Sequence, residues 1–248
     1  MSTIKIKHSD DFTLLKNMSP ELIVFDLAGT TVKDNHDVHR ALQNALGKYG
    51  VLISIEDANT VMGIPKPQAI RSLLNTCDVL HRPITEDFVQ EIHHTFVDEM
   101  IHFYQEDPSV AEKAGVSDTF RKLKESKLKI AIDTGFDRQI TDSILARLGW
   151  KENHLIDASV TSDEVPRGRP YPDLIFKAME LTQVKDSKCV AKVGDTTSDL
   201  LEGNSAGCGW VIGVTTGAYS RSELEKEKHT HLIENVHEVL EIFSLNVD

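Results

Sequence analysis

Four short apolar runs, each leading into polar or glycine-containing segments, stand out along the chain. They are LIVFD at 22–26, LKIAID at 128–133, CVAKVGD at 189–195 and GWVIGV at 209–214. Runs of this length predict buried strands, because a strand inside a parallel sheet is covered on both faces. Segments with apolar residues at helical spacing lie between them, at 138–148 and at 173–181, where Pro172 suits a helix start. This alternation predicts an α/β fold with a Rossmann-like, doubly wound parallel sheet.

One long stretch, from about residue 35 to 111, breaks the alternation of strands and helices. Its segments VHRALQNALGKYG and FVQEIHHTFVDEMIHFY have apolar residues at helical spacing, and Gly50 suits the end of the first helix. We therefore expect an all-helical insertion after the first strand. The predicted domains are a core formed by residues 1–34 and 112–248 and a helical domain formed by residues 35–111.

Composition and charge argue against several classes of function. The formal net charge of −12 argues against nucleic-acid binding, which depends on clustered lysine and arginine. No run of eighteen apolar residues occurs, so we expect no membrane-spanning helix. The first nineteen residues lack the apolar core of a signal peptide, and the three cysteines are scattered rather than clustered. These features predict a soluble protein of the cytoplasm.

Polar residues follow the predicted strands at the end where a doubly wound sheet binds its ligands. Asp26 ends the first run, Thr134 follows the second, and Asp195 ends the third, with Asp199 four residues later. Carboxylates and a hydroxyl are hard oxygen ligands that suit Mg²⁺ and a phosphoryl group. Arg169 precedes a predicted helix, where a guanidinium can bridge a carboxylate and a phosphoryl oxygen. Each residue alone could be a cap, a turn or a surface charge, but their order along the chain argues against coincidence.

This ordered set resembles the haloacid dehalogenase superfamily, and the resemblance runs from Leu22 over most of the chain. It implies a Rossmann-like core with a helical cap, here the insertion at 35–111, that closes over a small phosphonate or phosphate metabolite. It also implies that Asp26 is a nucleophile that forms an aspartyl intermediate with phosphorus. The implied roles of the other residues are phosphoryl binding for Thr134 and Arg169, and Mg²⁺ binding for Asp26, Asp195 and the Ala28 carbonyl, with support from Asp199. A homodimer is expected by analogy only.

The first motif departs from the pattern of most phosphatases in this superfamily. They carry a second aspartate that protonates the leaving group, whereas this chain has Ala28. The loss of such general acid catalysis typically costs about 10²- to 10⁴-fold in rate. The sequence Asp-x-Ala-Gly-Thr resembles the phosphonoacetaldehyde hydrolase branch of the superfamily, in which a lysine forms a Schiff base with the substrate aldehyde. An imine of this kind is an electron sink, so no acid at position 28 is needed.

Several other segments strengthen the resemblance to that branch. Met62-Gly63-Ile64-Pro65-Lys66 matches its cap segment and makes Lys66 the implied Schiff-base residue. The residues then expected to contact the substrate are Ala28, Gly29, Thr30, Met62, Gly63, Arg71 and Gly135. Lys66 must be partly neutral near pH 7 for this chemistry, which requires burial or a cationic neighbour such as Arg71.

Two departures leave the function open among three hypotheses. The enzyme of that branch has a histidine where this chain has Ala69 and a tyrosine where it has Phe136, so two groups that could carry protons are missing. Lys66 is therefore either an electrophile or a clamp for an anionic part of the substrate. The preferred hypothesis is hydrolysis of a carbon–phosphorus bond. The alternatives are hydrolysis of a small phosphomonoester, and a catalytically weak protein that binds a phosphorylated metabolite.

Overall fold

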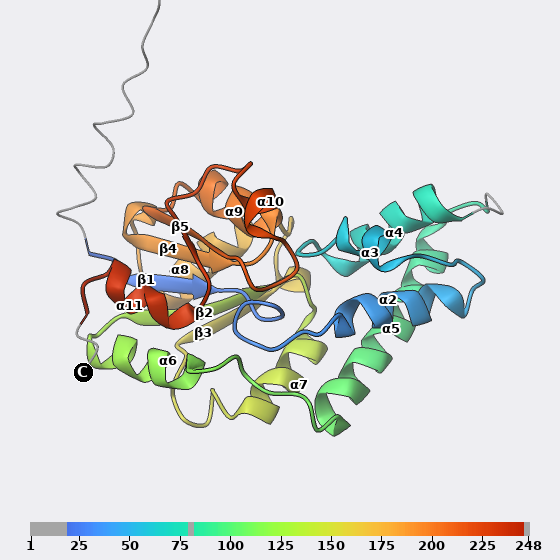
Figure 1. Cartoon of the computed structure of the whole chain (residues 1–248). Helices are drawn as coiled ribbons and strands as arrows, with labels where there is room; N and C mark the ends of the chain where they lie inside the picture. The colour runs from blue at the N-terminus through green and yellow to red at the C-terminus, as the bar shows by residue number, and fades with distance from the viewer. Residues whose placement is uncertain (1–18, 79–81, 246–248) are drawn as a thin grey trace, which may run out of the picture.

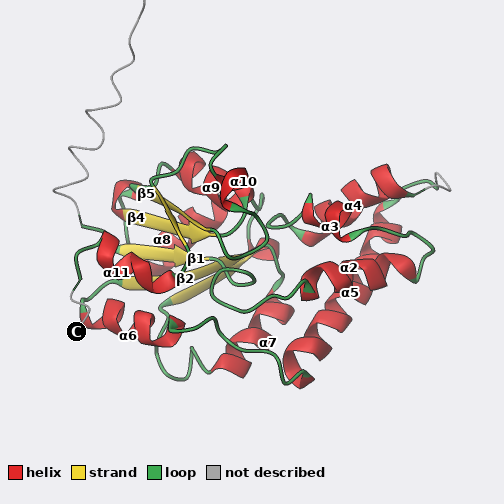
Figure 2. Ribbon diagram, in the orientation of Figure 1, coloured by secondary structure: helices red, strands yellow, loops and turns green. Residues whose placement is uncertain are grey.

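The structure is a computed structural model that describes residues 19–78 and 82–245. Six parallel strands form one sheet in these residues, and helices cover both faces (Figures 1 and 2). The strands are β1 (Leu22–Phe25), β2 (Lys129–Thr134), β3 (Ala158–Thr161), β4 (Val190–Gly194), β5 (Trp210–Val214) and β6 (His231–Ile233). Their order is β3-β2-β1-β4-β5-β6, and every neighbouring pair is parallel. This confirms the predicted α/β sheet.

Strand β1 lies at the centre of the sheet, and its side chains divide between two apolar layers. Leu22 and Val24 pack with helix α8 (Asp173–Thr182) and helix α9 (Thr197–Ala206). Ile23 and Phe25 point to the opposite layer, which contains α6 (Val116–Glu125), α7 (Arg138–Leu148) and α11 (Val239–Ile242). A short helix, α10 (Arg221–Leu224), joins the first layer through Leu224. The two-residue alternation of a strand therefore places apolar residues on both faces of β1.

The strand order fixes where a ligand can bind. From β1 the chain builds β2 and β3 on one side, and then returns to build β4, β5 and β6 on the other side. Loops that leave β1 and β4 therefore diverge, which opens a crevice at the carboxyl ends of these two strands. Asp26 and Asp195 each follow one of them directly.

Four helices, which we call the helical insert, occupy residues 37–106. They are α2 (Asp37–Gly47), α3 (Ile55–Asn59), α4 (Lys66–Cys77) and α5 (Glu86–Glu106), and the described part of this stretch contains no strand. Figure 1 shows the insert beside the end of the sheet toward which β1 points. Helix α5 packs against α7, and the rings of Phe96 and Tyr104 lie 6.4 and 6.1 Å from the ring of Phe136. The exact domain boundaries stay a prediction, and residues 1–18 of the predicted core lie outside the described residues.

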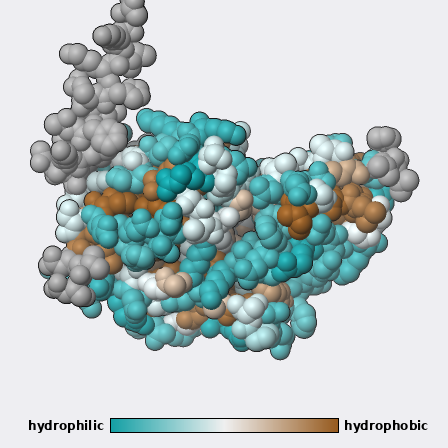
Figure 3. All heavy atoms as spheres, viewed as in Figure 1, coloured by the Kyte–Doolittle hydropathy of each residue, from teal (hydrophilic) through white to brown (hydrophobic). Residues whose placement is uncertain are grey.

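On the face drawn in Figure 3, hydrophilic residues cover most of the molecule and apolar residues appear in small groups. None of the described helices is both long and apolar enough to cross a membrane.

Two strands were not predicted from the sequence. Strand β3 (ASVT) is only half-buried over its first two residues, and β6 (HLI) has three residues at the edge of the sheet. Neither segment forms an apolar run, so a pattern search cannot separate them from loop. Helix α7 spans the predicted 138–148, and α8 extends the predicted 173–181 by one residue.

The aromatic contacts of Phe120 allow a test of the core. Phe120 is fully buried on α6, and its ring lies 5.0 Å from that of Phe25 and 5.2 Å from that of Trp150. We expect Phe120→Ala to lower the free energy of unfolding by about 3–5 kcal/mol, measured by urea denaturation, because it leaves a cavity behind β1. The control is Phe176→Ala on α8, which is 48% exposed and should cost less than about 1 kcal/mol. Equal losses would contradict this account of the core.

Candidate active site

The turn after β1 brings two carboxylates from neighbouring strands together. Asp26 and Asp195 are 6% and 0% exposed. Thr30 Oγ1 donates a hydrogen bond to Asp195 Oδ1 (2.8 Å), and the Ala218 backbone N–H donates to Oδ2 (2.6 Å). Gly29 has a φ of +87°, and a Cβ there would lie 2.3 Å from Asp195 Oδ2. Only glycine therefore lets this turn approach the second carboxylate so closely.

The Arg169 guanidinium is buried and pairs with four carboxylates. Its Nη1 lies 2.7 Å from Asp26 Oδ1 and 3.0 Å from Asp199 Oδ1, and its Nε lies 3.0 Å from Glu202 Oε2. Its Nη2 donates to the backbone carbonyl of Asp133 (2.8 Å) and also pairs with the Asp133 side chain. Arg169 is 1% exposed, so it fixes the Asp26 carboxylate from inside the protein.

A second buried cation, Lys192, completes this network. It lies in the middle of β4 with 0% exposure, and its Nζ is 3.1 Å from Asp199 Oδ1 and 3.2 Å from Glu202 Oε2. Its Nζ also pairs with Asp133. Lys192, Asp133 and Glu202 were not among the site residues predicted from the sequence. A lysine inside the apolar run CVAKVGD was the available signal, because a buried lysine needs carboxylate partners.

The carboxylates near the cavity are electrostatically crowded. Burial raises the pKa of Asp26 to about 6 and that of Asp195 to about 7. The neighbouring carboxylates Asp26 and Asp199 raise the Asp195 pKa further, whereas Arg169 opposes the rise at Asp26. Oxygen atoms of Asp26, Asp195 and Asp199 lie within 4.8 Å of one another. Such a set could hold a divalent metal ion, which would relieve the repulsion.

Asp199 differs from the other two acids in how its oxygens are used. Its Oδ2 accepts hydrogen bonds from the Thr196 backbone N–H (3.1 Å) and hydroxyl (2.6 Å) at the start of α9. Its Oδ1 faces Arg169 and Lys192. Direct metal ligation by Asp199 would compete with these partners, so its position fits a supporting contact behind the ligands better.

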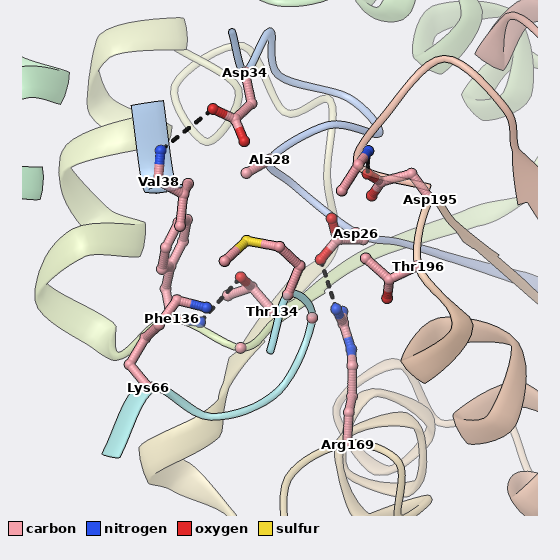
Figure 4. A pocket seen from close by; sticks show the side chains of 14 residues that line it. Asp26, Ala28, Asp34, Val38, Lys66, Thr134, Phe136, Arg169, Asp195 and Thr196 are labelled. Carbon is pink, nitrogen blue, oxygen red and sulfur yellow. Dashed lines mark hydrogen bonds and ion pairs between the residues drawn. The ribbon is translucent and has the colours of Figure 1, made fainter. Parts of the chain in front are cut away.

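A small cavity of about 30 Å³ separates these acids from the helical insert (Figure 4). The core contributes Asp26, Ala28, Thr134, Gly135, Phe136, Arg169, Asp195, Thr196 and Ala218, and the region of the insert contributes Asp34, Val38, Met62, Gly63 and Lys66. The loop before α4 fits tightly against the core, because a Cβ on Gly63 (φ +82°) would lie 2.3 Å from Thr196 Oγ1. This segment and the core therefore meet directly beside the cavity.

Lys66 is the first residue of α4 and brings an amine to this cavity. The residue is 3% exposed, and its Nζ donates to the Ile64 carbonyl at 3.3 Å and lies 5.2 Å from the ring centroid of Phe136. Burial lowers the Lys66 pKa to about 8; Asp26 opposes this shift and Arg169 adds to it. Among the described residues, no carboxylate lies within 4 Å of the Lys66 amine. A substantial neutral fraction near pH 7 to 8 follows.

The structure brings most of the predicted site residues together. Nine of them line the cavity, namely Asp26, Ala28, Met62, Gly63, Lys66, Thr134, Gly135, Arg169 and Asp195. Gly29, Thr30 and Asp199 do not line the cavity but lie next to residues that do. Gly29 and Thr30 lie against Asp195, and Asp199 pairs with Arg169.

Arg71 is not brought to the cavity. Its guanidinium pairs with Glu86 and its side chain is 40% exposed. Lys66 and Arg71 are five residues apart on α4, so their side chains point about 140° away from each other. Burial and Arg169, rather than Arg71, lower the pKa of the lysine.

Lys192 offers a direct test of the buried network. We expect Lys192→Met to lower the free energy of unfolding by about 3–5 kcal/mol, because it leaves buried carboxylates without their cation. Urea denaturation measures this change. The control Lys177→Met removes an exposed lysine that pairs with Glu180, and should cost less than about 1 kcal/mol. A Lys192→Met protein as stable as the control would show that the network does not need this charge.

Comparison with known proteins agrees with this geometry. The chain is 34% identical over 219 residues to a phosphonoacetaldehyde hydrolase from Bacteroides fragilis, covering 84% of this chain and 81% of that protein. It is 33% identical over 244 residues to a phosphonoacetaldehyde hydrolase from Bacillus cereus, covering 92% and 90%. The crystal structure of a phosphonoacetaldehyde hydrolase-like protein from Oleispira antarctica has the same fold, with a TM-score of 0.81, 19% identity and 91% of each chain covered.

The family match covers five of the six described strands, apart from Leu22, and nearly all of the site. Residues 23–214 match the family described as haloacid dehalogenase-like hydrolase, and this range includes Ile23–Phe25 of β1, all of β4 and every residue named in the cavity except Ala218. A sequence match of this extent, together with relatives that are 33–34% identical over most of the chain, shows the family. The chain belongs to the haloacid dehalogenase-like hydrolases and is a hydrolase with phosphonoacetaldehyde hydrolases among its relatives.

Proposed function

We propose that this hydrolase breaks the carbon–phosphorus bond of phosphonoacetaldehyde or a related phosphonate, with Asp26 as nucleophile and Lys66 as Schiff-base residue. The observation that carries the proposal is the buried Lys66 amine, whose pKa is lowered to about 8 and which lines the same cavity as Asp26. The names of the relatives from Bacteroides fragilis and Bacillus cereus support the substrate class.

Residues of the core carry out the transfer of the phosphoryl group. Asp26 Oδ attacks phosphorus while Arg169 holds its carboxylate, and Thr134 contacts the phosphoryl oxygens from the end of β2. Asp26, Asp195 and the Ala28 carbonyl would hold Mg²⁺, with Asp199 behind them. When bound, Mg²⁺ neutralises charge on the phosphoryl oxygens. The crowded carboxylates and their raised pKa values fit this cation.

Lys66 activates the carbon side of the carbon–phosphorus bond. Its neutral amine adds to the aldehyde carbon, and uptake of one proton with loss of water gives a protonated imine. The carbon–phosphorus bond then breaks, with its electron pair moving into an enamine as the phosphoryl group passes to Asp26. Water next cleaves the aspartyl phosphate, and protonation and hydrolysis of the enamine release acetaldehyde and free Lys66. No step needs an acid at position 28, which accounts for Ala28.

Ala69 and Phe136 provide no proton carrier for this chemistry. Ala69 is fully buried on α4, and the Phe136 ring lies beneath the Lys66 amine. Water or another base must therefore transfer the protons of imine formation. We propose a small phosphonate or phosphate metabolite as the ligand and the cytoplasm as the working compartment, which suits three free cysteines. The homodimer stays a prediction.

Trapping the imine tests the proposal. Borohydride treatment in the presence of phosphonoacetaldehyde should add one reduced two-carbon adduct to Lys66, detected by peptide mass spectrometry. Lys66→Arg keeps the charge but cannot form an imine, so it should show no adduct and at least about a 10³-fold lower rate of phosphate release. Phosphate release from a phosphomonoester by an enzyme with unmodified Lys66 would favour the phosphatase hypothesis. Binding without any turnover would favour the binding-protein hypothesis.

The raised pKa values of Asp26 and Asp195 predict how Mg²⁺ affinity depends on pH. Carboxylates bind the cation only when deprotonated, so affinity should rise as the pH increases through 6 and 7. We expect an increase of at least about tenfold between pH 5.5 and 7.5, measured by calorimetric titration with MgCl₂. Asp195→Asn should weaken binding and flatten the upper part of this curve. An affinity that does not change over this range would contradict the proposed ligands.

A further inference from the structure

Asp34 is an acidic residue that lines the cavity and has no part in the proposed reaction. It lies in the segment that joins the turn after β1 to α2, is partly exposed, and lines the cavity together with Ala28, Val38 and Lys66. Figure 4 shows its carboxylate between the start of α2 and Ala28. It therefore belongs to the half of the cavity that would hold the part of a substrate away from phosphorus, which we call the distal half.

Backbone hydrogen bonds fix the orientation of this carboxylate. Asp34 Oδ1 accepts from the Asp37 backbone N–H at 2.6 Å and from the Val38 backbone N–H at 3.3 Å. Within the described residues, Asp34 Oδ2 accepts no hydrogen bond that would turn it elsewhere. The side chain at position 28 is only a methyl group, so it leaves this oxygen access to the cavity.

The negative charge of Asp34 acts on the Lys66 amine across the cavity. Asp34 is among the groups that raise the pKa of Lys66, against the larger effect of burial. The other cation of the lining, Arg169, is already paired with four buried carboxylates. Lys66 and Asp34 therefore lie at the distal half of the cavity without pairing directly, and the lining residues include no further cation to receive a second anionic group.

We propose that Asp34 determines substrate specificity by rejecting a second anionic group, so that the distal end of the substrate is uncharged or cationic. This inference rests on the proposed function only in placing the phosphoryl group at Asp26. A carboxylate at the distal end would lie close to Asp34 in a small cavity lined mostly by buried residues, where like charges repel. A carbonyl, hydroxyl or amine would not meet this repulsion. Lys66 then serves a neutral carbonyl rather than a second anion.

Binding of three phosphonates with different distal groups tests this proposal. Calorimetric titration with ethylphosphonate, 2-aminoethylphosphonate and phosphonoacetate in MgCl₂, at about pH 7.5, requires no turnover. We expect the full-length protein to bind phosphonoacetate at least about tenfold more weakly than ethylphosphonate, with 2-aminoethylphosphonate bound at least as well as ethylphosphonate. Asp34→Asn keeps the shape and the hydrogen-bond acceptor at the start of α2 but removes the charge, and should reduce the tenfold ratio to about twofold or less.

Controls separate specificity from folding. Asp37→Asn changes an acidic residue of the same turn that does not line the cavity, and should keep the wild-type ratio. If Asp34→Asn does not fold, Asp34→Ser supplies a second acceptor without charge. An unchanged ratio in the folded Asp34 variants, tighter binding of phosphonoacetate than of ethylphosphonate to the wild-type protein, or no measurable binding of any of the three would overturn the proposal.

A negative result in the binding test of Asp34 can be distinguished from a failure of the proposed reaction. Absence of a borohydride adduct on Lys66 would remove the imine but would leave the binding ratio and its dependence on Asp34 intact. An unchanged ratio together with a trapped imine would remove only the role of Asp34.

Discussion

The candidate site depends on a guanidinium that is buried among carboxylates. Arg169 joins Asp26 after β1, Asp133 on β2, and Asp199 and Glu202 on α9. Moving these ions out of water costs several kcal/mol each, and only close pairing recovers that cost. The position of Asp26 is therefore coupled to the packing of two strands and a helix, which keeps the proposed nucleophile in one orientation.

The same network leaves an excess of negative charge that something must balance. The cluster contains five buried acids and only two buried cations, Arg169 and Lys192. Asp26, Asp133, Asp199 and Glu202 pair with these cations, whereas Asp195 does not. Burial raises the pKa of Glu202 well above its ordinary value, and Asp133 raises it further, so a proton can neutralise one acid. On the other side of Asp26, a divalent cation can neutralise the pair that it forms with Asp195. A proton and a metal ion would thus balance opposite sides of one cluster.

The sequence predicted the parts of the fold and site that follow from strong local patterns. Apolar runs that end in polar residues located β1, β2 and β4, and so brought Asp26, Thr134 and Asp195 to one cavity. The short strands β3 and β6 lack such a run, and were missed for that reason.

Residues whose roles depend on distant partners were harder to predict. Lys192 contradicts the apolar pattern of its strand, and only the fold shows that Asp133, Asp199 and Glu202 surround it. Arg71 was expected near Lys66 from sequence spacing, but the helical rotation of α4 directs it to the surface. Asp34 resembles an ordinary helix-capping residue until the cavity shows what else it faces.

The central place of β1 has a consequence for the way in which the protein is made. This strand ends at Phe25, whereas its two partners begin only at Lys129 and Val190. While the ribosome synthesises the chain, β1 has no partner on either edge until more than half of the protein has emerged. The helices of residues 37–106 contact one another locally and can fold earlier. The strand that leads to Asp26 is thus among the first to be translated and among the last to gain both partners, which makes the nascent sheet dependent on its C-terminal half.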